Sequence, residues 1–106
     1  MANWIQVTHI DALTDGVIEV VDLDDGRAVA VTRANGNLYA FLDECSHEAL
    51  PLSDGEIEGT EVVCPYHAAR FDLASGAATA PPAYDGIPVF AVREVDGVVE
   101  IDTDSA

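Results

Sequence analysis

The sequence predicts an all-β domain of antiparallel strands, a small sandwich or barrel. Short runs rich in Val, Ile, Tyr and Phe recur along the chain, and the dipeptides Asn-Gly and Asp-Gly separate some of them. Side chains of different character also alternate within several runs, as in a strand with two distinct faces. A chain of 106 residues has room for one hydrophobic core. We therefore expect a single domain over residues 1–106.

Each predicted strand is bounded by turn residues. Asn35-Gly36 and Asp96-Gly97 favour tight hairpins, because both central residues of a type I′ turn need positive φ. Residues 9–13 are expected to form a helical turn capped by Thr8, and Ser-Asp-Gly at 53–55 is expected to form a turn. Alternation predicts sheets with one buried face. The predicted strands cover residues 4–8, 17–23, 28–34, 38–43, 60–64, 69–73, 89–95 and 98–101.

The charge balance excludes several classes of partner. Twenty Asp and Glu face four basic side chains, all Arg, which gives a net charge of −16. Such a surface repels nucleic acid and anionic membranes, and it attracts a basic protein. No apolar run approaches the roughly 18 residues of a membrane span, and the first residues carry no export signal. We expect a cytoplasmic protein with no nucleic-acid or membrane partner, whose acidity serves solubility, docking or both.

Four potential metal ligands are concentrated in residues 45–67. They form two pairs, Cys45-x-His47 and Cys64-x-x-His67, separated by sixteen residues. Each pair follows a predicted strand, and a hairpin-like arrangement of these strands would bring both loops side by side. In a reducing compartment such cysteines are metal-bound or catalytic rather than joined in a disulfide.

Three kinds of metal site could use these four side chains, and they differ in the spacing that they require. Structural zinc sites usually take both cysteines from one loop and both histidines from another, whereas each loop here is mixed. Mononuclear copper would require a third soft ligand nearby. A Rieske [2Fe–2S] cluster requires two cysteines on one iron and two histidines on the other. Two loops that each supply one cysteine and one histidine suit this requirement. A zinc-stabilised Cys₂His₂ interaction module stays open as an alternative.

The motif resembles that of Rieske-type ferredoxins, over most of the chain from about Asn3 to Ile101. The resemblance implies the Rieske iron–sulfur fold, in which a cluster-binding subdomain (about residues 43–83) is inserted into an antiparallel β sandwich or barrel base. It also implies one [2Fe–2S] cluster held by Cys45, His47, Cys64 and His67, and a loop over the cluster that contains Pro81 and Pro82. The residues that carry it are Cys45-x-His47, Cys64-Pro65-Tyr66-His67, Phe71-Asp72, Gly76 and Pro81-Pro82.

Departures from the family pattern indicate which members of the family the chain resembles. Rieske subunits of respiratory bc complexes have two further cysteines, where this chain has Leu50 and Tyr66. Those subunits also place a Ser and a Tyr hydroxyl against the cluster, where this chain has Ala69 and Phe71. The pattern is instead similar to the ferredoxins of bacterial ring-hydroxylating dioxygenases. Ala68 stands where the family most often has Gly, so a positive φ there would bring strain.

This resemblance implies an electron-transfer protein with no catalysis of its own. It implies a monomer that takes one electron from a flavin-dependent ferredoxin reductase and passes it to a terminal oxygenase through transient, electrostatic complexes. Asp43, Glu44 and Glu48 flank the first loop as candidate docking residues, or are ordinary solvated side chains. Arg70 either pairs with a carboxylate near the second loop or is a plain surface residue. The small subunit of a nitrite reductase-like assembly is a further alternative.

Overall fold

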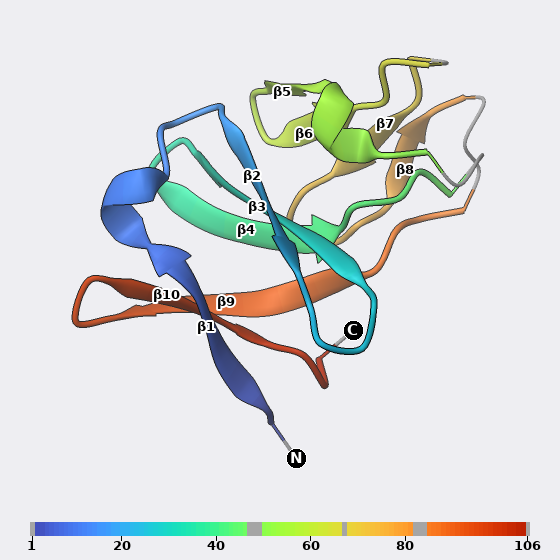
Figure 1. The fold of residues 1–106 in the computed structure, drawn as a ribbon. Helices are drawn as coiled ribbons and strands as arrows, with labels where there is room; N and C mark the ends of the chain where they lie inside the picture. The colour runs from blue at the N-terminus through green and yellow to red at the C-terminus, as the bar shows by residue number, and fades with distance from the viewer. Residues whose placement is uncertain (1, 47–49, 67, 82–84, 106) are drawn as a thin grey trace.

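Two antiparallel sheets make up the protein in the computed structural model, which describes residues 2–46, 50–66, 68–81 and 85–105. A six-stranded sheet has the order β1-β10-β9-β4-β3-β2, and a four-stranded sheet has the order β5-β6-β7-β8 (Figure 1). The strands are β1 (Trp4–His9), β2 (Ile18–Asp22), β3 (Ala28–Ala34), β4 (Asn37–Leu42), β5 (Glu56–Glu58), β6 (Glu61–Val63), β7 (Arg70–Asp72), β8 (Ala78–Ala80), β9 (Val89–Val95) and β10 (Val98–Asp102).

The two predicted hairpin turns are confirmed. Asn35 and Gly36 have φ values of 52° and 81° between β3 and β4, and Asp96 and Gly97 have values of 52° and 80° between β9 and β10. Positive φ at both central residues is the conformation of a type I′ turn, and its twist suits the flanking strands. These local signals fix two hairpins of the large sheet.

Strand β9 joins the two halves of the large sheet. It pairs with β10 over Val95 to Ala91, but with β4 only through Phe90 and Val89. The sheet therefore curls into a barrel-like base, with one apolar cluster inside it. Residues of this inner cluster include Leu13, Val29, Val31, Ala40, Phe90, Val99 and Ile101.

The expectation of one buried face is wrong for β3. Val29 and Val31 point into the inner cluster, while Ala30 and Ala34 belong to a second cluster that also contains Phe41 and Phe71. This second cluster lies between the base and the four-stranded sheet. Both faces of β3 are thus covered, which agrees with the unbroken apolar run of residues 28–31 at its start.

Strands β5 and β8 were not predicted. Their sequences, Glu-Ile-Glu and Ala-Thr-Ala, have few of the residues that favour strands. They form because β6 and β7 offer edges to pair with, β5 along β6 and β8 along β7. Tertiary pairing decides their structure, and local propensity does not.

Among the described residues, the helical segments are two short 3₁₀ turns. Residues Ile10–Ala12 (η1) form the predicted helical turn, but the N-cap is His9 without a side-chain hydrogen bond, so the Thr8 cap is wrong. Residues Leu52–Asp54 (η2) form a second turn where the sequence predicted a simple Ser-Asp-Gly turn. In the described ranges, a helix with the length and hydropathy of a membrane span is not found.

Candidate metal centre

The first cysteine loop begins at the end of β4. The Asp43 amide donates to the Ala28 carbonyl at 2.9 Å, which ties the strand end to the base. Two residues later the Cys45 amide donates to the Leu50 carbonyl, also at 2.9 Å, and this bond closes the loop. The Cys45 side chain is buried, with 2% of its surface exposed. His47 lies outside the described residues.

The second cysteine loop connects β6 to β7. The Cys64 amide donates to the Ala69 carbonyl at 2.7 Å, and the Ala68 amide donates to the Cys64 carbonyl at 3.0 Å. Ala68 has a φ of 59°, so the condition under which strain was expected at this position is met. Cys64 is buried to the same degree as Cys45. His67 lies outside the described residues.

Tertiary packing brings the two loops together. Cys45 and Cys64 belong to one apolar cluster, together with Leu52, Ala69 and Phe71, and they are not joined by a disulfide. The expected hairpin-like arrangement of the two preceding strands is wrong, since β4 lies in the large sheet and β6 in the small one. The cysteines therefore share one apolar cluster because the small sheet packs onto the base.

The donor chemistry fits an iron–sulfur cluster. A buried thiolate is costly unless a cation compensates it, and metal binding provides that compensation. One buried cysteine on each of two loops is the arrangement expected for a cluster that is ligated by residues of both loops. Within the part of the chain that the structure describes, no group of three or more metal-binding side chains is assembled. His47 and His67, the other two predicted ligands, are not in that part.

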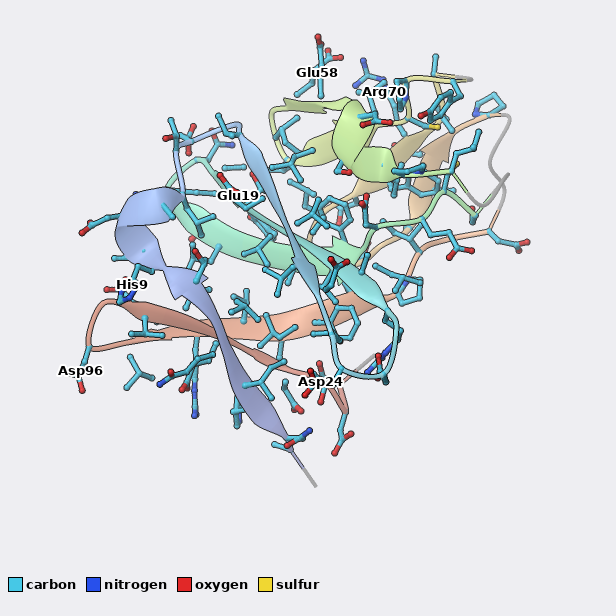
Figure 2. The ribbon with its side chains drawn as sticks, in the orientation of Figure 1. His9, Glu19, Asp24, Glu58, Arg70 and Asp96 are labelled. Carbon is cyan, nitrogen blue, oxygen red and sulfur yellow. The ribbon has the colours of Figure 1, made fainter. Side chains whose placement is uncertain are left out.

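Arg70 pairs with carboxylates of the small sheet. Its guanidinium lies 3.1 Å from Glu58 and 3.1 Å from Glu61, and Figure 2 shows Arg70 beside Glu58 at the outer end of that sheet. Hydrogen bonds from Thr79 and then Arg70 lower the pKa of Glu61. The prediction that Arg70 pairs with a carboxylate is confirmed, and its two partners lie on β5 and β6.

Two further contacts hold the loops, and the sequence did not reveal them. Tyr66, between Cys64 and His67, donates its hydroxyl to Asp54 at 2.7 Å, and this bond raises the pKa of Tyr66. Ser46, next to Cys45, donates its hydroxyl to the Asp85 carbonyl, so the first loop contacts the segment that follows the prolines. Pro81 is exposed, and Pro82 is not among the described residues. No sequence signal separates Asp54 from the many other acidic residues, and the Asp85 contact uses a backbone carbonyl, which every residue has.

The predicted docking residues differ in role. Both carboxylate oxygens of Asp43 accept hydrogen bonds from Ser53, one from the amide at 2.6 Å and one from the hydroxyl at 2.7 Å. Asp43 is therefore a structural residue. Glu44 is exposed, and Glu48 lies outside the described residues.

Comparison with known proteins decides the family. The sequence model of the family described as "Rieske [2Fe-2S] domain" matches residues 3–91. The chain belongs to this family. As a Rieske domain it has a [2Fe–2S] cluster as its cofactor, which agrees with the paired cysteine loops.

Relatives of this Rieske domain are ferredoxin components. It is 34% identical over 91 residues to the ferredoxin component of naphthalene 1,2-dioxygenase/salicylate 5-hydroxylase systems from Ralstonia sp., with 86% of each chain covered. The ferredoxin of Sphingomonas yanoikuyae B1 is 33% identical, with a TM-score of 0.89 over 95% of this chain and 99% of that one. The structure described as a complex of reduced oxygenase and oxidized ferredoxin in carbazole 1,9a-dioxygenase is 27% identical, with a TM-score of 0.91 and 97% and 95% covered.

Proposed function

We propose that this Rieske domain is a one-electron carrier of a ring-hydroxylating dioxygenase system. It takes an electron from a flavin-dependent ferredoxin reductase and delivers it to a terminal oxygenase. The observation that carries the proposal is the similarity along nearly the whole chain to proteins named as ferredoxin components. The carbazole 1,9a-dioxygenase structure, which contains an oxygenase and a ferredoxin, supports the oxygenase as the acceptor.

The ligands in this proposal are Cys45, His47, Cys64 and His67. The burial of both cysteines at the bases of adjacent loops supports their half of the set. When bound, the cluster supplies a one-electron couple whose potential is raised by the two neutral imidazoles. The chain itself keeps both sulfur atoms away from water and fixes the loop bases by backbone hydrogen bonds. The subdomain boundaries of about 43–83, the monomeric state and the cytoplasmic location stay predictions.

Metal and sulfide analysis tests this proposal directly. Purified protein should contain about two iron and two acid-labile sulfide per chain, and it should become paramagnetic on reduction. Changing His47 to Ala should abolish the cluster. His9 is the matched control, because it is exposed at the N-cap of η1, and His9→Ala should leave iron and sulfide unchanged. Stoichiometric zinc without sulfide would instead support the interaction module.

Reconstitution tests the direction of electron flow. The reduced protein should transfer its electron to a ring-hydroxylating oxygenase and should be re-reduced by a flavin-dependent reductase. A chain that carries the cluster but exchanges electrons with neither would contradict the carrier role and favour a nitrite reductase-like assembly.

A further inference from the structure

The short helix η2 lies in sequence between the two cysteine loops and is bonded to the base of the first. Its central residue, Ser53, donates its amide and its hydroxyl to Asp43 at 2.6 and 2.7 Å. Asp43 precedes Cys45 by two residues, and its own amide is bonded to the base strand β3 through Ala28. The start of the first loop and η2 therefore form one hydrogen-bonded unit.

The last residue of η2 is bonded to the tip of the second loop. Asp54 accepts the hydroxyl hydrogen of Tyr66 at 2.7 Å. The Tyr66 side chain is 44% exposed, so packing alone does not fix it. A hydrogen bond to a carboxylate is among the stronger kinds, and it specifies the direction in which the ring points.

Steric fit also fixes η2 against the second loop. A Cβ at Gly55 would lie 1.9 Å from the Val63 carbonyl oxygen and 3.1 Å from Pro65 Cδ. Only glycine permits this close approach to the residues on either side of Cys64. Leu52 at the other end of η2 is fully buried in the cluster that contains both cysteines. The helix is thus held from three sides.

From these contacts we propose that η2 is a brace that sets the position of one cysteine loop relative to the other, with Tyr66 and Asp54 as positioning residues. The inference rests on the proposed function in one respect, namely that both loops ligate one cluster. The brace would limit the movement of the second loop when the charge of the cluster changes.

The decisive variant is Tyr66→Phe, because it removes the hydrogen bond and keeps the ring and the formal charge. We expect faster hydrogen exchange at the Ala68 amide, which bonds within the second loop. We also expect a broader electron paramagnetic resonance spectrum of the reduced protein, because the loop samples more positions. Iron loss to bathophenanthroline should accelerate roughly threefold to tenfold, the effect of one hydrogen bond.

Companion variants separate the loss of the Tyr66–Asp54 hydrogen bond from the loss of the Asp54 charge. Asp54→Ala should reproduce the effects of Tyr66→Phe, and the double variant should be no worse than either single one, since both remove the same bond. Asp54→Asn keeps an oxygen acceptor and should restore the narrow spectrum and the slow iron loss. Tyr39→Phe, which removes a hydroxyl from β4, is the matched control and should change nothing. Ser53→Ala should weaken the attachment of η2 to Asp43, at the start of the first loop.

The outcomes distinguish the two proposals. Wild-type protein without iron and sulfide would overturn the proposed function. A cluster-loaded wild type whose spectrum, exchange and iron loss are unaffected by Tyr66→Phe would overturn the brace alone. Additive effects of Tyr66→Phe and Asp54→Ala would also overturn it, because the two side chains would then act separately.

Discussion

Ala68 has a left-handed backbone conformation, with a φ of 59°, although it carries a Cβ. For a residue other than glycine this conformation costs about 1–2 kcal/mol. Its amide is bonded to the Cys64 carbonyl, so the loop holds the residue there. The strain is local to the second cysteine loop.

Replacing Ala68 with Gly should relieve this strain. We expect the free energy of unfolding to rise by about 1 kcal/mol, after the entropy that glycine adds to the unfolded chain is subtracted. The thermal midpoint should rise by roughly 4 °C, since 1 kcal/mol shifts a domain of this size by that amount or more. Ala74→Gly is the control, because Ala74 lies in an exposed turn and is not among the described residues with positive φ. It should lower the midpoint, and a fall with Ala68→Gly too would contradict the argument.

Ala69 and Phe71 determine the potential that we expect for the cluster. Both side chains are fully buried among the apolar residues that surround the two cysteines, and neither has a hydroxyl group. Without such donors the reduced, more negative state is less stabilised. The potential should lie near the lower end of the Rieske range of about −150 to +300 mV.

Changing Ala69 to Ser should raise that potential. A hydrogen bond of about 1 kcal/mol corresponds to roughly 40 mV for a one-electron couple, since 59 mV is a tenfold change. Voltammetry of the purified protein measures the shift, and Ala74→Ser, in an exposed turn, is the control. A wild-type potential well above zero, or no change with Ala69→Ser, would show that missing hydroxyls do not set the value.

At the scale of elements, the turn that connects β7 to β8 depends on one carboxylate. Asp72 accepts hydrogen bonds from the Ser75 amide and from the Ser75 hydroxyl, both at 2.8 Å. These bonds lower the pKa of Asp72, since they favour its charged form. Because the folded pKa is below the unfolded one, the stabilisation is present above the unfolded pKa of about 3.9 and is lost as the pH falls through the folded pKa.

Ser75→Ala should therefore weaken the turn in a pH-dependent way. We expect the pKa of Asp72, followed by NMR, to move up toward its ordinary value. The difference in thermal midpoint between wild type and variant should be largest near pH 6 and should shrink toward pH 3. Ser105→Ala is the control, because that hydroxyl bonds to backbone groups, the Ala91 amide and the Asp102 carbonyl, so the effect of its loss should not change with pH. A difference that is constant with pH would mean that the Asp72 carboxylate is not the group involved.

At the scale of the whole molecule, the net charge of −16 should steer the protein to a basic partner surface. Arg27, Arg70 and Arg93 each pair with a neighbouring carboxylate. Electron transfer to the oxygenase should slow as the salt concentration rises past ~0.1 M, where the Debye length is about 10 Å. Stopped-flow measurements of the transfer rate test this.

Two charge-removing variants locate the steering. Glu44→Gln removes an exposed charge next to the first cysteine loop, whereas Asp96→Asn removes one at the β9–β10 turn, at the opposite end of the molecule (Figure 2). The first should slow the transfer more than the second. A rate that is flat or higher in molar salt, with both variants like wild type, would mean that the acidity only maintains solubility.

Features that depend on neighbouring residues could be predicted from the sequence. Asn35-Gly36 and Asp96-Gly97 specify their turns through positive φ, and the runs they join become strands. The spacing of the cysteines and histidines also predicted the cofactor, because metal ligation constrains residue types directly. Features that depend on pairing between distant segments could not be predicted in this way. Strands β5 and β8 exist because β6 and β7 offer edges, and β4 and β6 lie in separate sheets that packing brings together. Asp43 and Asp54 resemble any other acidic residue until the fold supplies Ser53 and Tyr66, since a hydrogen bond between residues ten or twelve positions apart has no local signal.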